Sequence, residues 1–471
     1  MTTLLDLPNE IKLEIIETIA PDDIENFSLC CKSVYDLAGR TLRQHMVDKT
    51  TYRRCFSLST WNEGHTMCLV AYCKLRDMSE SRRLRLYPRS IRIGNYTVSD
   101  QDRETNRLRH PEYVWSRSTQ VMDKVRGISD SIFNNLDSPC VDMDEMKAWR
   151  KKIGDGEVGA ANCLLLTLLP NVERIDVDEL DRSHSEMSDM IYKISKTNED
   201  VSSMIWEKLS LVKLQEVHVH SLACLGGATT QSRVLEACMT LPSLRIVRGT
   251  QLGRRYKFNE WIYPDRCSNV TELHFRGCTL AVKHLACLFK HLKALQIFSY
   301  DHSRLPETPG KEYGPDELID ALRLYAKTTL TFFNYTSDAR DHTGDHRMPN
   351  ASILRRFEAL KTLRMSRVML IVKGAPRKLV DELPSSLEEL ELVDPISATE
   401  ARQMFEGILA TKQERLPKLR LVVFEGAIPF DNEVIAAYER IGLVLDWRDT
   451  GTNRIQKTDQ AWLGGVECLR S

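Results

Sequence analysis

The sequence of 471 residues lacks the motifs that mark the common enzyme classes. It has no G-x-S-x-G, no P-loop, no H-E-x-x-H and no glycine-rich dinucleotide fingerprint. None of its 13 cysteines stands in a C-x-x-C pair, and nothing marks any of them as an activated nucleophile. We therefore expect a non-catalytic protein that uses no cofactor and no metal.

The sequence also lacks a long apolar run and a large net charge. Its most apolar stretch, residues 163–169, is too short to cross a bilayer. The net charge of −1, with 28% charged residues, argues against a general nucleic-acid binder and against an anionic membrane surface as partner. The odd number of cysteines and the absence of a secretory signal predict reduced thiols in the cytoplasm, the nucleus or both.

The first 45 residues form a dense apolar stretch. Pro8 pushes Leu7 into an extended conformation and suits the first turn of a helix, which Glu10 supports through the helix dipole. Helical spacing predicts three short helices, the third over residues 33–42. The apolar side chains exceed what three short helices can bury. They are Leu7, Pro8, Ile11, Ile15, Ile24, Leu29 and Val34.

This stretch resembles the F-box, whose signature is an L-P-x-E-[IL] opening, an acidic turn, an L-x-x-[CV]-[CS]-[KR] element and an aromatic residue. The matching segments are Leu7–Ile11, Asp22-Asp23, a compressed Leu29–Lys32, and Tyr35. The resemblance implies that the seven apolar residues named above contact a Skp-family adaptor, which bridges to cullin and RING subunits, while Ile19 and Phe27 pack inside. An ordinary helical hairpin, or burial of these residues by the rest of the chain, is the alternative.

We expect four segments: 1–48 as the F-box, 49–160 as a linker or N-terminal cap, 161–450 as a repeat domain and 451–471 as a tail. Within the second segment, alternation at Ile91 and Ile93 predicts a strand of a capping repeat. Helices are expected over 66–75, 122–136 and 142–153. The cluster of Arg82, Arg83 and Arg85 is either a solvated surface or a localisation signal.

From Leu164 onward the chain repeats an apolar-x-x-apolar-x-apolar unit. Its anchors from Leu214 onward lie 25 to 35 residues apart, and a polar insertion over 182–200 follows the first anchor. Several units follow a Leu-Pro lead-in, in which proline ends the preceding helix. The anchors are Val172, Leu214, Leu244, Val270, Leu295, Leu330, Leu360, Leu387 and Leu419.

One short strand and one helix per repeat is typical of an irregular leucine-rich-repeat solenoid with parallel strands and convex helices. A doubly wound α/β domain is the competing fold, but no glycine-rich phosphate loop opens any helix. Residues 4–45 closely, and residues 160–450 loosely, resemble the fungal F-box proteins with degenerate leucine-rich repeats, and the segment 154–177 is particularly similar to members of that set. We thus expect an α+β to α/β protein in which three helices precede the solenoid.

Alternation along each strand sends the anchors inward and leaves polar side chains on the concave face. The middle repeats then align His218, His220, Arg248, His274 and Arg276 as a cationic patch for an acidic or phosphorylated segment, or simply as solvated side chains. Asn334 and Arg364 extend this predicted target-binding face. A metal at His218, His220 and His274 is a weaker alternative. So is one at the loop residues Asp341, His342, Asp345 and His346.

The resemblance implies the substrate-recognition subunit of an SCF-type ubiquitin ligase. Its solenoid would hold a target protein near the conjugating enzyme. The alternative is a structural protein that binds the Skp-family adaptor without cullin. An enzyme with an unrecognised site within 46–160 is a third hypothesis.

Overall fold

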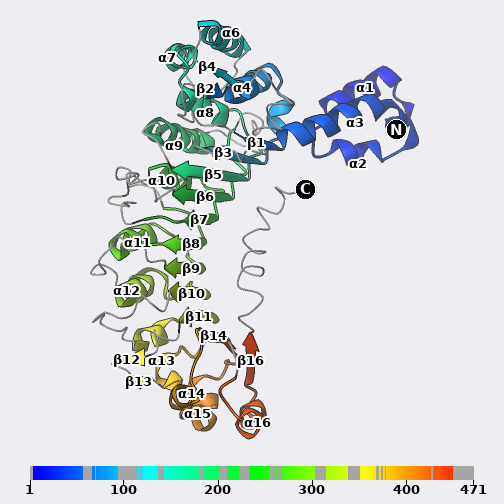
Figure 1. Cartoon of the computed structure of the whole chain (residues 1–471). Helices are drawn as coiled ribbons and strands as arrows, with labels where there is room; N and C mark the ends of the chain where they lie inside the picture. Colours follow the sequence, from blue (N-terminus) through cyan, green and yellow to red (C-terminus); the bar gives the residue numbers. More distant parts are fainter. Residues whose placement is uncertain are drawn as a thin grey trace. The chain divides into compact units, whose positions relative to one another are not determined.

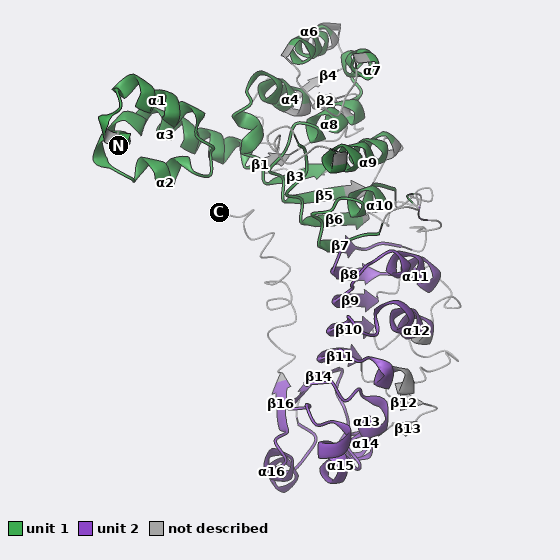
Figure 2. Ribbon diagram, turned by 180° about the vertical axis from the view of Figure 1, so that it is seen from behind, with its two compact units in different colours: residues 1–225, 231–247, 262–269 green, residues 226–230, 248–261, 270–471 purple. Residues whose placement is uncertain are grey.

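The computed structural model describes most of the chain and separates it into two compact units (Figure 2). The first contains residues 1–225, 231–247 and 262–269, and the second 226–230, 248–261 and 270–471. The described residues are 4–56, 66–68, 70–93, 114–116, 119–135, 143–179, 184–200, 209–221, 233–253, 261, 263, 267–302, 315–337, 351–366, 371–372, 375–376, 378–425 and 428–448.

The first unit opens with an N-terminal helical segment, residues 4–52 (Figure 1). It contains the 3-10 turn η1 (Leu4–Asp6) and the helices α1 (Asn9–Thr18), α2 (Ile24–Ser28) and α3 (Lys32–Tyr52). Its core consists of Ile16, Ile24, Val34 and Ala38, all fully buried. Ile19 and Phe27 pack against this core, as expected. The third helix runs ten residues beyond its predicted end, so the expected boundary at residue 48 lies inside α3.

The rest of the first unit is a parallel sheet with helices along one side (Figure 1). The strand order is β1 (Arg54–Phe56), β3 (Ser90–Ile93), β5 (Arg174–Glu179), β6 (Glu216–Ser221), β7 (Ile246–Thr250). Residues 246–247 of β7 belong to this unit and residues 248–250 to the second. A separate antiparallel pair joins β2 (Thr66–Cys68) to β4 (Val114–Ser116). The helices are α4 (Val70–Glu80), α6 (Thr119–Asn135), α7 (Met143–Gly154), α8 (Val158–Leu166), α9 (His184–Asp200) and α10 (Arg233–Met239); the 3-10 turn η2 spans Leu84–Leu86.

The second unit repeats the same plan, with seven complete parallel strands among its described residues. Their order is β8 (Glu272–Cys278), β9 (Ile297–His302), β10 (Phe332–Ser337), β11 (Thr362–Ser366), β14 (Glu389–Val393), β15 (Leu421–Glu425), β16 (Val444–Arg448). The short strands β12 (Ile371–Val372) and β13 (Ala375–Pro376) form an antiparallel pair. The helices are α11 (Val282–Lys290), α12 (Pro315–Ala326), α13 (Leu379–Glu382), α14 (Ala398–Met404), α15 (Ile408–Arg415) and α16 (Asn432–Arg440), with the 3-10 helix η7 at Ala351–Arg356.

The predicted repeat anchors build the core of both units. Every anchor from Val172 to Leu419 is at most 2% exposed, and each precedes a strand of a parallel sheet. In the second unit, aromatic side chains also align across neighbouring strands. The Tyr300 and Tyr335 rings stack with centroids 6.2 Å apart, and those of Phe298 and Phe333 lie 6.0 Å apart. Cross-strand pairs of this kind stabilise a sheet in its register.

The Leu-Pro lead-in forms a turn before the strand. The Leu244 amide donates to the Leu241 carbonyl at 3.2 Å, so Pro242 occupies the second position of a four-residue turn, which its fixed φ favours. The Leu419 amide donates to Leu416 in the same way at 3.1 Å, with Pro417 in the turn. In these two lead-ins, proline therefore also occupies the turn that precedes the strand.

The predicted solenoid with parallel short strands is confirmed, and several local expectations are corrected. The strand predicted at Ile91 and Ile93 is present as β3, and because β3 pairs in parallel with β1 and β5, the sheet already begins at Arg54. The expected polar insertion over 182–200 contains helix α9, whose buried Met187, Ile191 and Ile194 face the core. The helix predicted over 66–75 is instead β2 followed by α4.

Strand β16 continues the repeat beyond the last anchor that the pattern identified. The expected helices over 122–136 and 142–153 correspond to α6 and α7. The tail 451–471 and the loop residues Asp341, His342, Asp345 and His346 lie outside the described residues.

Candidate functional site

The N-terminal helical segment exposes some of the apolar side chains predicted to bind an adaptor. Leu29 is 73% exposed and Ile11 42% exposed, and Pro8 at the start of α1 is also exposed. Leu7 and Ile15 are half-buried. These five residues remain candidates for an interface, because apolar side chains left in water on a small helical unit mark a binding surface.

Ile24 and Val34 are corrections to the predicted set. Both are 0% exposed and belong to the core that joins α1, α2 and α3. A partner cannot contact them in this conformation, so their role is to hold the three helices together. Apolar spacing could not distinguish them from Leu29, because helical periodicity alone does not say which side of a short helix meets its neighbours.

Three exposed residues of α3 were not among the predicted contacts. Tyr35 is 52% exposed, Met46 54% and Val47 58%. Tyr35 belongs to the F-box signature and could have been included on that ground. Met46 and Val47 lie beyond the predicted end of the helix. The only feature of the sequence that could have indicated an exposed apolar surface there is that these two apolar residues are adjacent.

The N-terminal helical segment is bonded to the first repeats through residues 83–89. Arg89 forms an ion pair with Asp22, lies 3.7 Å from Glu173 through its Nε, and donates to the Asn171 carbonyl at 3.1 Å. The Arg83 guanidinium donates to the Glu17 carbonyl at 2.7 Å. A segment held through charge-assisted bonds at several points keeps a defined orientation on its neighbour.

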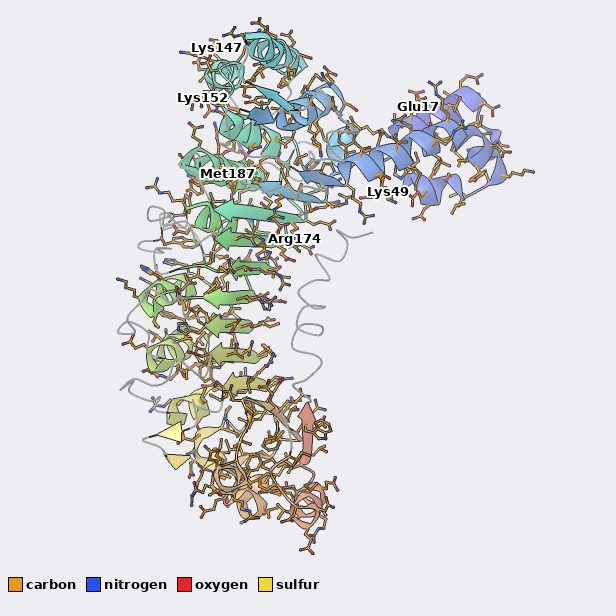
Figure 3. All side chains as sticks on the ribbon, in the orientation of Figure 1. Glu17, Lys49, Lys147, Lys152, Arg174 and Met187 are labelled. Atoms are coloured by element: carbon orange, nitrogen blue, oxygen red, sulfur yellow. The ribbon has the colours of Figure 1, made fainter. Side chains whose placement is uncertain are left out.

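Buried His45 adds a second connection between α3 and this part of the chain. Its Nδ1 lies 3.0 Å from the Tyr87 hydroxyl, and its Nε2 lies 3.0 Å from Oε1 of Glu25. Lys49, labelled on α3 in Figure 3, donates to the same carboxylate at 2.6 Å. Hydrogen bonds from Lys49 and His45 outweigh burial and lower the pKa of Glu25. The carboxylate is therefore ionised at neutral pH and ties α2 to α3.

The basic cluster of Arg82, Arg83 and Arg85 is largely structural. Arg83 makes the contact to Glu17 described above, and Arg85 donates to the carbonyls of Met78 and Ser79 at 2.5 and 2.9 Å. Arg82 is exposed. Two of the three guanidinium groups thus serve the fold, which neither interpretation of the sequence had foreseen.

The polar face of strands β5 and β6 carries a charged cluster around Arg174, which is labelled in Figure 3. Its side chains are largely buried, and His218 is only 7% exposed. Arg174 contacts Asp176 at 2.8 Å and Glu216 at 3.4 Å, and His218 Nδ1 lies 3.5 Å from Asp176. Burial raises the pKa of Asp176, but bonds with His218 and Arg174 outweigh it and lower that pKa to about 2. The carboxylate is thus charged and balances the nearby cations.

His220, on the same face, is not a cation. Burial, followed by repulsion from His218, lowers the pKa of His220 to about 3, so its imidazole is neutral at physiological pH. With His218 beside an aspartate and His220 neutral, the predicted cationic patch is not formed in the first unit. Residue pattern alone could not show this, because Asp176 comes from a different repeat.

In the second unit the remaining predicted target-binding residues also lie beside acidic or polar neighbours. His274 Nε2 is 3.2 Å from Glu272, Arg364 Nε is 3.1 Å from Glu391, and the Asn334 amide donates to Ser299 at 2.8 Å. Arg276 is exposed and Arg248 is half-buried. The face is therefore polar with charges of both signs, which suits hydrogen bonding to a mixed surface better than capture of a purely acidic one.

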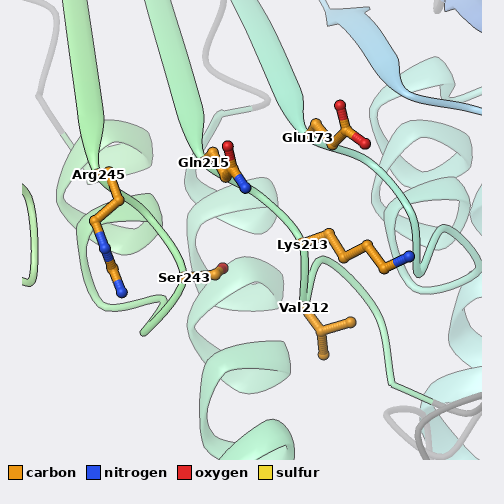
Figure 4. A pocket seen from close by; sticks show the side chains of 6 residues that line it. All are labelled: Glu173, Val212, Lys213, Gln215, Ser243 and Arg245. Atoms are coloured by element: carbon orange, nitrogen blue, oxygen red, sulfur yellow. The ribbon is translucent and has the colours of Figure 1, made fainter.

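A shallow pocket of about 330 Å³ lies before strands β5, β6 and β7 in the first unit (Figure 4). Glu173, Lys213 and Arg245 place both signs of charge around it. Arg245 already donates to the Pro242 and Leu244 carbonyls at 2.7 and 2.8 Å. The pocket holds no pairing of nucleophile and base, and its groups mainly secure the turns that precede the strands.

None of the described helices is long and apolar enough to cross a membrane. A family model described as an F-box domain matches residues 4–41, and one described as a leucine-rich repeat domain matches residues 113–445. The second match covers more than half of the chain, and the two together follow the same order as the helical segment and the repeats. No curated protein matches the chain significantly.

Proposed function

We propose that this chain, which belongs to the leucine-rich repeat family and carries an N-terminal F-box domain, is the substrate-recognition subunit of an SCF-type ubiquitin ligase. F-box domains generally bind Skp-family adaptors, and the combination with leucine-rich repeats is typical of non-catalytic adaptors. In this role the chain itself catalyses no reaction. It brings a target protein close to the conjugating enzyme.

The observation that carries the proposal is the exposure of Pro8, Ile11 and Leu29 on the F-box. These three residues are assigned to the interface with a Skp-family adaptor, with half-buried Leu7 and Ile15 beside them in sequence. Burial of such side chains on binding supplies about 25 cal/mol for each Å² of apolar surface removed from water. The adaptor then connects the chain to cullin and RING subunits.

The bonded connection between the F-box and the first repeats supports a positioning role. Arg83, Arg89 and His45 join the two parts at separate points. A fixed connection restricts the orientation of a bound target relative to the adaptor, which raises the effective concentration of its lysines near the conjugating enzyme. The target-binding surface is assigned to the exposed faces of the strands, with Arg276, Asn334 and Arg364 in the second unit.

The test is co-purification of the tagged full chain from a eukaryotic extract beside a Pro8→Ala, Leu29→Ala double variant. The ligase function predicts that adaptor and cullin accompany the wild type and are lost from the variant. Leu324→Ala is the matched control, because Leu324 on α12 is also exposed, at 66%, and lies outside the F-box.

Recovery of the adaptor without cullin would contradict the ligase function and favour a structural adaptor complex. Recovery of neither protein with the wild type would contradict adaptor binding altogether. Loss of both proteins from the Leu324→Ala control would show that the assay does not report on the F-box surface.

A further inference from the structure

Strands β5 and β6 bring three metal-ligating side chains together on the polar face of the sheet in the first unit, where His218 is buried and Asp176 and His220 are half-buried. Asp176 is the direct register partner of His218. His220 follows His218 by two positions, which puts both imidazoles on one face of the strand. One ligand atom from each of the three residues lies within 4.8 Å of the other two. The two imidazole rings are 3.7 Å apart between centroids.

This set differs from the one that the sequence suggested. The pattern offered His218, His220 and His274, but His274 belongs to the second unit and lies 3.2 Å from Glu272. Asp176 takes its place because parallel pairing of β5 with β6 sets an aspartate opposite the first histidine. A carboxylate and two imidazoles are hard and borderline donors that suit zinc.

Arg174 is the group that a metal ion would displace from Asp176. Its guanidinium lies 2.8 Å from the Asp176 carboxylate and 3.3 Å from Nδ1 of His218. The guanidinium also lies 3.4 Å from the Glu216 carboxylate. Arg174 would therefore still be paired with one carboxylate if Asp176 bound a metal. Arg92, the register partner of Asp176 on β3, is another nearby cation.

We propose that Asp176, His218 and His220 form a zinc-binding site that joins strands β5 and β6 on the polar face of the sheet in the first unit. Three protein ligands leave a fourth tetrahedral position, which a water molecule fills. Small movements of the two imidazoles bring the donor atoms from their present spacing to zinc-ligand distances of about 2.0 to 2.2 Å. The site is independent of adaptor binding, because none of its ligands belongs to the F-box.

The test is direct titration of the chelator-treated full chain with Co²⁺, a spectroscopic substitute for Zn²⁺. Exposed thiols such as Cys30 and Cys267 also attract zinc, and thiolate ligation is recognised by its intense near-ultraviolet charge-transfer band. The expected result is one equivalent of Co²⁺ with a spectrum of nitrogen and oxygen ligands, displaced by Zn²⁺.

His220→Ala is expected to weaken this binding at least about 100-fold, since loss of even an outer-sphere partner weakens metal sites by about 10- to 100-fold. Asp176→Asn, which preserves the shape of the side chain but removes its charge, is also expected to weaken Co²⁺ binding. His274→Ala is the matched control and should bind as the wild type does. Circular dichroism checks that each variant is folded.

Two results would overturn the site. One is a wild type that binds no Co²⁺ with nitrogen and oxygen ligands. The other is a folded His220→Ala or Asp176→Asn variant that retains wild-type affinity and spectrum.

Discussion

The repeats bury all of their apolar anchors, whereas the F-box buries part of its apolar pattern and exposes the rest. In the repeats, Leu360, Leu387 and Leu419 are 0% exposed, because each strand and helix is covered by the next repeat. In the F-box, Leu29 is 73% exposed and Ile11 42% exposed although both belong to the same apolar pattern. The contacts that Arg83 and Arg89 make with the helical segment leave Leu29 and Ile11 uncovered. The difference shows that an apolar pattern predicts burial only where the fold supplies a second layer.

The largest effect is expected from truncating a repeat anchor. Leu360→Ala removes a fully buried side chain between strands and should lower the free energy of unfolding by about 2 to 5 kcal/mol. Leu324→Ala, which removes an exposed leucine on α12, should change it by less than about 0.5 kcal/mol. Urea denaturation of the two variants beside the wild type measures both. Equal losses would contradict the assignment of the anchors as the core.

The next effect is expected at Gly249, at the end of β7. A Cβ there would lie 2.6 Å from both Leu252 Cδ1 and Phe275 Cδ1, and Phe275 is fully buried. Gly249→Ala should therefore cost about 1 to 3 kcal/mol through overpacking. Gly127→Ala in α6 is the control, because nothing lies within 4 Å of its new methyl group.

Alanine is the better helix former, so the Gly127 variant should be up to about 1 kcal/mol more stable than the wild type. Thermal unfolding should show a lower melting temperature for the Gly249→Ala variant and an equal or higher one for the Gly127→Ala variant. A Gly249→Ala variant as stable as the wild type would refute the close approach of β7 to Phe275.

A smaller effect is expected where the F-box meets the repeats. Arg89→Ala removes the bonds to Asp22 and Asn171 and should reduce stability by about 1 kcal/mol, since the guanidinium is only 17% exposed. It should also release the F-box, which limited proteolysis would detect as faster cleavage after residues of α3. Arg420→Ala is the control, since Arg420 also pairs with acidic residues but is 65% exposed. Cleavage at the wild-type rate would contradict the fixed connection.

The smallest effect is a pH dependence at Glu25. Its pKa is lowered in the folded state, so the unfolded chain binds more protons near and below the ordinary value of 4.5. The stability contributed by Glu25 is present above pH 4.5 and is lost as the pH falls through the lowered pKa. Glu25→Gln should therefore show a weaker loss of stability on acidification than the wild type. Parallel acid dependence in the two proteins would exclude this contribution.

The fold could be predicted from the sequence because its repeat anchors obey a local rule. From Val172 to Leu419, each anchor introduced a strand, and parallel stacking follows from one strand and one helix per repeat. What the sequence could not show depends on neighbours from other repeats. Asp176 meets His218 only through the register of β5 with β6, and Arg89 meets Asp22 only after the F-box folds against the first repeats.

The same limit explains the errors in the candidate adaptor surface. Ile24 and Val34 have the spacing and character of contact residues, yet they face the other two helices and are 0% exposed. Met46 and Val47 were missed because α3 continues to Tyr52, supported by the bonds of His45 and Lys49 to Glu25. Where tertiary hydrogen bonds determine the end of a helix, the neighbouring sequence does not indicate where that end lies.

The central claim is that exposed apolar residues of the F-box bind a Skp-family adaptor. The most direct measurement is the affinity of a purified adaptor for the wild-type chain and for an Ile11→Ala, Leu29→Ala variant, by calorimetry. We predict at least about a tenfold weaker affinity for the variant, equivalent to about 1.4 kcal/mol, with its unfolding free energy changed by less than about 0.5 kcal/mol. Equal affinity for the two proteins would contradict the claim.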